Sequence, residues 1–564
     1  MNPQRAPRPR PAGLGDSPPF RRGRWSLAAA AAAAVTATLA LAGCASGSGN
    51  GASPGSTAAK PVSGGSLTYA VDQTEDTLNP AVSGLDVTGL IDRNIFDSLV
   101  VQAGPNSFGP WLASRWTISP DGKTYTFFLK QGVTFQDGTP FNAAAVKASL
   151  DYAVNPATKS EEAAALIAPY AGSTVVSDYQ VQVKLKQPFS PLLQALSTPY
   201  LGIQSPAELA KPASGYLPVG TGPFRYVAWN KNENVILQAT PAYKSPPSNA
   251  AHAGPANLSK LTFAFIGEDE TRYGALTSGQ VQAIARVPPV DVKPLQGSPG
   301  FYLQTAQAPG NNYNLYLNVT SAPLTSVDVR KALAESINVP ALVNSVYFGQ
   351  NKAATNTLSP ATAFFDPAAR ALGYNLADAE RLLAAAGYAK TDSAGYRVNR
   401  AGQELTLVWP YAAILNREQR NVLSDGIVAE AKQAGIKIER PAIDTPTLIS
   451  DLENGKYSLF DSSQGRASAD ILRYAYTVPW AQGGGDLSLV SNPQLTSWLT
   501  EAAQTTNATV QQQDYFRAQQ YVLGNAVVLP LYVENYRLGA SGKVHGITFT
   551  PGASPLFYDA WLSR

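Results

Sequence analysis

The chain has 564 residues, of which 44% are apolar and 15% are charged; this length exceeds what one hydrophobic core can hold and predicts two or three soluble domains. The formal charge of +3 comes from residues 1–43, which hold six Arg and one Asp, whereas the rest of the chain carries a net −2, so we expect no nucleic-acid partner. A single Cys excludes an internal disulfide and a Cys-rich metal site, and His252 and His545, which are far apart in sequence, are expected to be surface or packed residues rather than metal ligands. We expect no metal site and no cofactor.

The first 43 residues have the pattern of a secretory leader. Six arginines precede an apolar run at residues 27–41, which is shorter than the ~20 residues of a membrane-spanning helix but suits a signal peptide. The run ends in Leu41-Ala42-Gly43-Cys44, which resembles the bacterial lipobox, where the Cys carries a diacylglycerol. We therefore predict a lipoprotein signal peptide at 1–43 with lipidation at Cys44. An ordinary signal peptide with a coincidental Cys is the alternative, and the choice between Sec and twin-Arg export stays open.

A Gly- and Ser-rich stretch follows the Cys. Residues 44–65 lack apolar bulk, and their composition is typical of a flexible tether. An acylated Cys and a tether predict an extracytoplasmic protein that is lipid-anchored to the cell membrane, in the periplasmic space if an outer membrane is present.

The clearest local pattern lies at residues 108–150. Ser119-Pro120-Asp121-Gly122 is a turn signal, and the alternation of Tyr125, Phe127 and Leu129 then predicts a half-buried strand. A second short strand is expected to close at Phe135. Asn142 can cap a helix whose apolar residues recur at helical spacing. The predicted order is hairpin, turn and capped helix.

Strands and helices alternate along the rest of the chain. Alternating or continuous apolar runs predict strands at residues 66–71, 181–186, 261–266, 311–318 and 526–533. Amphipathic patterns with end signals predict helices at residues 268–280, 327–337 and 375–388. The Gly220-Thr221-Gly222 segment lacks the Lys-Ser/Thr of a phosphate loop and is followed by Pro, so we interpret it as a turn. The succession predicts an α/β protein.

Three motifs follow one another in a fixed order: P-x-L-A-x-x-W at residues 110–116, D-G-x-x-Y-x-F-x-L at 121–129 and F-x-D-G-T-P-F-x-A at 135–143. Their order and spacing resemble those of the extracytoplasmic solute-binding proteins of the oligopeptide/dipeptide group, family five. Further matches are T-L-N-P at 77–80 and V-R-K-A-L at 329–333. The resemblance covers nearly all of the chain after residue 65.

The resemblance implies a two-lobed periplasmic-binding-protein-like fold of type II, with an extra subdomain, in which two hinge strands join the lobes. By this analogy lobe I takes residues 66–305, with an inserted subdomain at about 96–205. Lobe II takes residues 306–529, and residues 530–564 return to lobe I. Such lobes close around a ligand by hinge motion.

The residues that anchor peptides in this family are replaced here. Peptide-binding members hold the ligand's amino group with an Asp in lobe II, and the best alignment places Arg466 near that position, with Asp470 four residues on. Dipeptide binders hold the carboxylate with an Arg before Pro-Tyr, where this chain has Trp409 before Pro410-Tyr411. A buried Arg466 would favour an acidic or hydroxyl-bearing ligand; in the alternative, Arg466 pairs with Asp470 and both are structural.

Other ligand-binding candidates follow from aromatic character or family position. Trp409 and Tyr411 offer flat faces to an apolar, aromatic or sugar-like group, and Trp480 is near enough in sequence to join a cleft wall. Thr74, Asn311 and Asn312 are candidates through family position alone. No Ser-His-Asp grouping, H-E-x-x-H or G-x-S-x-G motif occurs, and we expect no catalytic residue.

These observations predict a substrate-binding lipoprotein of an ATP-binding-cassette (ABC) importer that captures peptides or peptide-like solutes and is not an enzyme. Its expected partners are the solute, the ABC permease and ATPase subunits and the membrane that holds the lipid anchor, and we expect a monomer. The alternatives are an exported lipoprotein hydrolase, a receptor for a sugar or metal chelate, and a signalling or chaperone role on the same fold.

Overall fold

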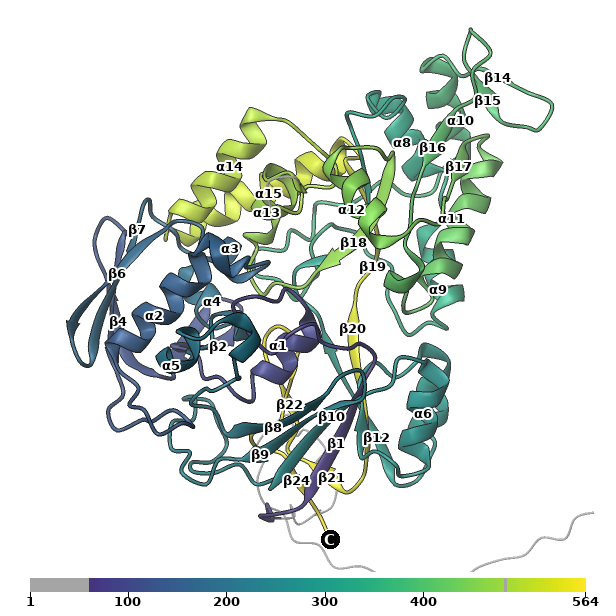
Figure 1. The fold of residues 1–564 in the computed structure, drawn as a ribbon. Helices are drawn as coiled ribbons and strands as arrows, with labels where there is room; N and C mark the ends of the chain where they lie inside the picture. The colour runs from purple at the N-terminus through teal and green to yellow at the C-terminus, as the bar shows by residue number, and fades with distance from the viewer. Residues whose placement is uncertain (1–59, 481–483) are drawn as a thin grey trace, which may run out of the picture. The chain divides into compact units, whose positions relative to one another are not determined.

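The computed structural model describes residues 60–480 and 484–564 (Figure 1). The predicted signal peptide, the lipidation site at Cys44 and tether residues 45–59 lie outside the described residues. The Gly64 N–H donates to the Asn257 carbonyl at 2.7 Å, and the Ser259 N–H donates to the Gly65 carbonyl at 3.0 Å. Within the described residues, these bonds to the folded body begin at Gly64, one residue before the predicted end of the tether.

Lobe I is built on a seven-stranded sheet with the order β12-β20-β11-β1-β10-β9-β8. In β1, Leu67 and Tyr69 are buried on one face as the alternation predicts, and Ala70 is buried as well because helices cover the other face. The strands are β1 (Ser66–Val71), β8 (Phe224–Asn230), β9 (Asn234–Ala239), β10 (Lys260–Phe265), β11 (Ala283–Ile284), β12 (Phe301–Gln307) and β20 (Asn535–Ser541). The helices of this lobe are α1 (Asp86–Asp92), α6 (Asp269–Thr277) and α7 (Val292–Gln296). The chain ends in the paired short strands β21 (Val544–His545) with β24 (Trp561–Leu562), and β22 (Thr548–Phe549) with β23 (Pro555–Leu556).

An inserted subdomain follows β1 and α1 and has its own core, drawn mainly from residues 99–203. Its antiparallel sheet has the order β4-β5-β7-β6, and α2 begins where the Asn142 side chain accepts the Ala145 N–H at 3.0 Å, as predicted. The expected second strand at Phe135 is an isolated bridge between Thr134 and Pro140, because the tight turn leaves no room for a ladder. The strands are β2 (Val100–Gly104), β3 (Ser107–Pro110), β4 (Ala113–Ile118), β5 (Thr124–Leu129), β6 (Tyr170–Ser177) and β7 (Gln180–Leu185); the helices are α2 (Ala143–Val154), α3 (Ala163–Leu166), α4 (Leu192–Ala195) and α5 (Pro206–Leu209).

Lobe II is organised around β13 (Asn311–Leu317), in which every residue is buried. It lies between β18 (Leu459–Gln464) and β19 (Val528–Tyr532), and both pairings are antiparallel. Two smaller pairs are parallel β16 (Thr406–Val408) with β17 (Lys437–Glu439) and antiparallel β14 (Lys390–Thr391) with β15 (Arg397–Val398). The helices are α8 (Val327–Glu335), α9 (Val339–Val346), α10 (Leu376–Ala385), α11 (Arg420–Gln433), α12 (Thr445–Glu453), α13 (Ile471–Thr477), α14 (Pro493–Gln504) and α15 (Ala508–Gly524).

The chain crosses between the lobes twice. It leaves lobe I between β12 and β13, through residues 308–310, and returns between β19 and β20, through residues 533–534 (Figure 1). Gly310 has a φ of +102°, and a Cβ there would lie 2.2 Å from the Gln464 carbonyl oxygen. Only glycine fits this crossover, because both the backbone conformation and the space exclude a side chain. Among the residues that the structure describes, no helix combines the length and apolarity needed to cross a membrane.

Candidate binding site

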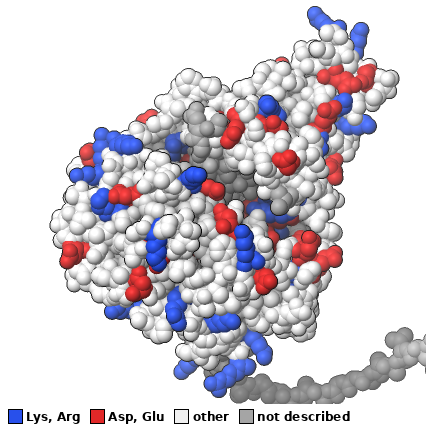
Figure 2. All heavy atoms as spheres, in the orientation of Figure 1, with Lys and Arg blue, Asp and Glu red and all other residues white. Residues whose placement is uncertain are grey.

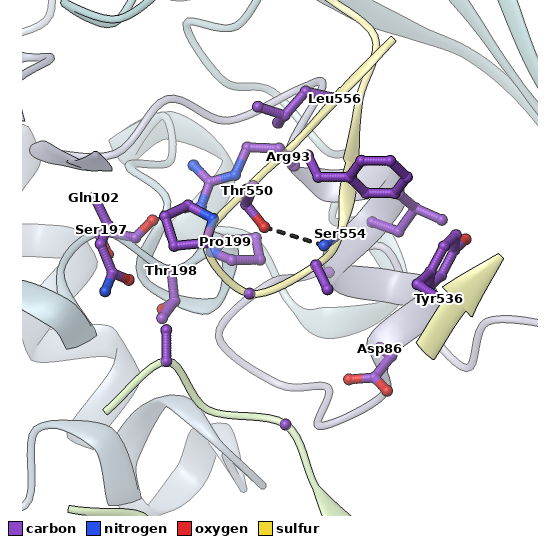
Figure 3. Close-up of a pocket in the computed structure, with 18 of the residues that line it drawn as sticks. Asp86, Arg93, Gln102, Ser197, Thr198, Pro199, Tyr536, Thr550, Ser554 and Leu556 are labelled. Atoms are coloured by element: carbon purple, nitrogen blue, oxygen red, sulfur yellow. Dashed lines mark hydrogen bonds between the residues drawn. The ribbon is translucent and has the colours of Figure 1, made fainter. Parts of the chain in front are cut away.

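A cavity of about 490 Å³ is lined by lobe I, the inserted subdomain and lobe II (Figure 3). The volume falls in the range of small-molecule sites, ~300–1,000 Å³. The lining comes from residues 71–73, α1, residues 197–200, residues 463–467, residues 534–536 and residues 548–559. Segments that are far apart in the sequence therefore meet around one cavity. On the face of the molecule seen in Figure 2, charged side chains of both signs are mixed.

The two lobes contact one another at the cavity wall. Arg466 of lobe II forms an ion pair with Glu162 of the subdomain, with 2.7 Å between nitrogen and oxygen. On the hinge side, Arg286 of lobe I forms an ion pair with Glu418 of lobe II. The Ser190 N–H also donates to the Ala503 carbonyl at 2.8 Å, so the subdomain packs against α14. The structure therefore has the arrangement of lobes closed over the cavity.

The hinge-side pair belongs to a buried network of charges. Arg286 also contacts Asp72 at 3.4 Å, and Arg420 contacts Glu534 at 2.7 Å and Glu418 at 3.5 Å. Burial lowers the pKa of Arg286, but the carboxylates of Glu418, Asp72 and Glu534 outweigh that effect and raise it well above its usual value. Burial likewise raises the pKa of Glu418, and Arg286 and Arg420 outweigh it, so the pKa lies well below its usual range. These groups remain charged and neutralise one another.

The backbone is unusual where this network crosses the lobes. Arg286, Glu418 and Gln419 all have positive φ angles, of 49°, 56° and 59°. Such conformations cost of order 1 kcal/mol or more each in non-glycine residues and gather at functional sites, where surrounding contacts hold them. Ion pairs supply those contacts for Arg286 and Glu418, and Gln419 directly follows Glu418 in the chain.

Helix α1 contributes two charged side chains to the cavity, Asp86 and Arg93 (Figure 3). Arg93, at the C-cap, donates to the Ser98 hydroxyl at 2.8 Å and to the Ser197 carbonyl at 2.6 Å, and its guanidinium lies 4.9 Å from the Trp111 ring centroid. Burial lowers the pKa of Arg93 to about 10, so it is charged at neutral pH. Asp86 is exposed to the cavity and forms no ion pair or hydrogen bond with a described residue.

Aromatic side chains form much of the remaining wall. Tyr536 shares a hydrogen bond of 2.6 Å with the Tyr69 hydroxyl, and burial raises its pKa to about 12. Tyr558 stacks on His252, with 4.3 Å between ring centroids, and His252 contacts Asp559 at 2.7 Å. The wall combines apolar faces with fixed polar groups, as binding sites for small solutes do.

Of the eight ligand-binding residues predicted from the sequence, Arg466 alone lines the cavity. Its partner is Glu162 rather than Asp470, which pairs instead with Arg473 at 2.7 Å. The alternative in which Arg466 pairs with Asp470 is therefore wrong, because each of these two residues forms an ion pair with a different partner. Because Glu162 neutralises the Arg466 guanidinium, Arg466 does not favour an acidic ligand in this closed arrangement.

The other seven lie elsewhere. Trp409 is fully buried in the lobe II core, where its Nε1–H donates to Asp461 at 2.6 Å. The Asn312 side chain donates to the carbonyls of Asn356 and Leu358, both at 2.8 Å. The remaining placements are Asn311 buried in β13, Tyr411 under the Arg440 guanidinium, Trp480 against the lobe II core, Asp470 in its pair, and Thr74 exposed beside the lining residue Gln73.

Sequence reasoning missed α1 and the segment 548–559. Asp86 and Arg93 are seven residues apart, and opposite charges on one helix face would have been a signal if a helix had been predicted there. The segment 548–559 carries no motif, and the chain's return to lobe I is what brings it to the cavity.

Comparison with known proteins agrees with the fold. The model of the bacterial extracellular solute-binding proteins, family 5, matches residues 107–485. The glutathione-binding protein GsiB of Escherichia coli K12 is 27% identical over 508 residues, which cover 88% of this chain and 94% of GsiB.

Solved structures of similar fold include NikA of Brucella suis in complex with Fe(III)-EDTA, with a TM-score of 0.79 and 22% identity over 88% of this chain and 100% of NikA. Another is DppA of Helicobacter pylori in complex with the peptide STSA, with a TM-score of 0.76 and 22% identity over 89% of this chain and 99% of DppA. The predicted two-lobed α/β fold is confirmed. The chain belongs to the bacterial extracellular solute-binding proteins of family 5.

Proposed function

We propose that this protein captures a peptide or peptide-like solute between its lobes and delivers it unaltered to the permease of an ABC importer. The observation that carries the proposal is the cavity of about 490 Å³, which both lobes line and interlobe ion pairs flank. A site of this kind binds by closure and releases by opening, which suits transfer to a membrane permease.

The relatives support a peptide-like ligand. GsiB is a glutathione-binding protein, and DppA was solved with the peptide STSA. NikA, of similar fold, was solved with Fe(III)-EDTA, so a metal chelate is the second candidate. The aromatic wall and the charges of both signs in this cavity match a peptide's apolar side chains and charged ends.

The mode of attachment and the absence of catalysis are part of the same proposal. We infer a lipid anchor at Cys44 from the lipobox-like sequence, and a monomer working with permease and ATPase subunits. Of the cavity carboxylates, Asp72, Glu162 and Glu534 each contact an arginine and Asp559 contacts His252, an arrangement that fixes charge; Asp86 forms no ion pair with a described residue. Labelling with radioactive palmitate tests the anchor: Cys44→Ser should abolish the label.

Ligand binding is tested by calorimetry and thermal unfolding of the purified protein with dipeptides, tripeptides, glutathione and Fe(III)-EDTA. A true ligand at 100 times its Kd stabilises the folded state by about 2.7 kcal/mol, which raises the Tm of a chain of this size by about 2–3 °C. Mass spectrometry of the released ligand should return it unchanged. A flat response to all peptides, or conversion of the bound compound, would overturn the proposal.

A further inference from the structure

Most charged side chains of the cavity are already paired within the protein. Arg466 pairs with Glu162, Arg286 with Asp72, and Glu534 with Arg420. Charge that is neutralised internally contributes little to recognising a charged ligand. The cavity side chains whose charges are not paired within the protein are therefore the candidates for contacts with a charged ligand.

Asp86 and Arg93 form no ion pair with a described residue, although burial, which lowers the pKa of Arg93, is opposed by the buried carboxylate of Asp97. No described cationic nitrogen lies within ion-pair distance of the Asp86 carboxylate, and no described carboxylate oxygen lies within that distance of the Arg93 guanidinium. Arg93 uses two of its five N–H donors on Ser98 and Ser197. Asp86, Arg93 and, from lobe II, Arg417 are thus the charged side chains of the cavity that form no ion pair with a described residue.

Both residues belong to one short helix, and its geometry relates them. Seven residues make two turns of an α-helix, so Asp86 and Arg93 lie on one face, with their Cα atoms about 10 Å apart along the axis. Gly89 and Leu90, which lie between them on that face, also line the cavity. Figure 3 shows both charged side chains among the lining residues. Helix α1 therefore has a negative and a positive side chain near its two ends, and Pro199 and Tyr200 pack on Gly89 between them.

We propose that the ligand binds in the cavity as a zwitterion, with its ammonium group at Asp86 and its carboxylate at Arg93. An extended chain spans about 3.3–3.6 Å per residue, and a separation of about 10 Å therefore suits a free peptide of two or three residues. This inference rests on the proposed function and names its substrate class. It moves both ionic contacts from lobe II, where the family's usual anchors are replaced, to lobe I.

The remaining unpaired arginine, Arg417, supplies a matched control. It lines the cavity from lobe II, and its Nη1 atom is buried without a hydrogen-bond partner. It lies next to Glu418, whose pKa it helps to lower, so its charge acts on the hinge network rather than along α1. Arg417→Gln removes the same charge as Arg93→Gln from the same cavity.

The experiment measures Kd by calorimetry for one dipeptide and one tripeptide, each in free, N-acetylated and C-amidated form. With the wild-type protein, each block should weaken binding about 10- to 100-fold, since each removes a charge-assisted contact. Asp86→Asn should bring free and N-acetylated peptides within about threefold of one another. Arg93→Gln should do the same for free and C-amidated peptides. Arg417→Gln should weaken free and blocked peptides by the same factor, because it alters the hinge network, and the exposed Asp178→Asn should change neither affinity nor preference.

The outcomes separate this inference from the proposed function. Equal binding of free and blocked peptides by the wild-type protein overturns the inference and leaves peptide binding standing. A preference for the free carboxylate that is lost in Arg417→Gln but kept in Arg93→Gln also overturns it. If no peptide binds at all, both fail. The comparison of free and blocked peptides uses the wild-type protein, so it tests the inference even if a variant does not fold.

Discussion

Arg466 of lobe II and Glu162 of the inserted subdomain are joined by an ion pair of 2.7 Å in the cavity wall. Their side chains are only 12% and 18% exposed. Burial raises the pKa of Glu162 although Arg466 opposes that effect. The pair forms only when the two lobes approach one another, so it is a feature of the closed arrangement.

Glu162→Gln should therefore weaken ligand binding by about 10-fold, because the closed form loses a charge-assisted contact and leaves Arg466 without its carboxylate. Calorimetry with the best ligand measures the loss, and small-angle scattering should show a larger radius of gyration at a given ligand concentration. Glu161→Gln, an exposed neighbour, is the control. Identical affinities for Glu162→Gln and the wild type would contradict the role of the pair.

Glu75 should make stability depend on pH. It is buried, neither carboxylate oxygen has a hydrogen-bond partner in the described chain, and burial raises its pKa to about 7. Because the folded protein holds this proton more tightly than the unfolded chain, the stabilisation is present at low pH and is lost as pH rises through about 7. Between pH 5 and 8 the unfolding free energy of the wild-type protein should fall by about 1–2 kcal/mol more than that of Glu75→Gln.

Urea unfolding of both proteins at the two pH values measures that difference. Glu233→Gln, at an exposed position, should show no such change relative to the wild type. A parallel response of the wild type and Glu75→Gln across the pH range would rule out the buried, protonated state of Glu75.

Gly310→Ala should destabilise the hinge severely. The new Cβ would meet the Gln464 carbonyl oxygen at 2.2 Å and the Arg466 amide nitrogen at 2.5 Å, in addition to the strain at φ +102°. Gly300 has a comparable φ of +87° but open space around a Cβ, so Gly300→Ala should cost only about 1 kcal/mol. We expect Gly310→Ala to lose at least about 2 kcal/mol more. Thermal unfolding of the two variants separates the steric clash from the backbone strain. Equal losses of stability in Gly310→Ala and Gly300→Ala would contradict the steric clash at Gly310.

Trp409→Phe should lower stability without changing ligand affinity. The indole is fully buried in the lobe II core and donates to Asp461, and losing that bond together with packed volume should cost about 2–4 kcal/mol. The Kd should stay within about twofold of the wild-type value. A large loss of affinity with an unchanged Tm would instead indicate that Trp409 contacts the ligand. Trp498→Phe, at a half-buried position in α14, controls for loss of an indole.

The local elements were predictable because their causes lie within a few residues. Asn142 and Asn375 cap α2 and α10 by accepting N–H groups three residues ahead. Val181, Val183 and Leu185 alternate in sequence and are buried on one face of β7. The order of motifs at residues 110–143 was enough to indicate the family, since each motif is read from adjacent residues.

The binding site was not predictable in the same way. From the sequence, Asp470 was the obvious ion-pair partner for Arg466, because it is only four residues away. Glu162 is far away in sequence, and it becomes the partner only because the subdomain packs against lobe II. Trp409 matched the position of a ligand-binding Arg, but its apolar ring gains more from the lobe II core than from the cavity.

The amino-acid sequence by itself determined the class of protein, its α/β character and the start and end of many helices and strands, because short-range hydrogen bonds and hydrophobic periodicity are written along the chain. The tertiary structure alone decided which charges are neutralised and which, on α1, still face the cavity. That selection depends on distances between groups far apart in sequence, and Coulomb and desolvation energies follow those distances rather than the order of residues.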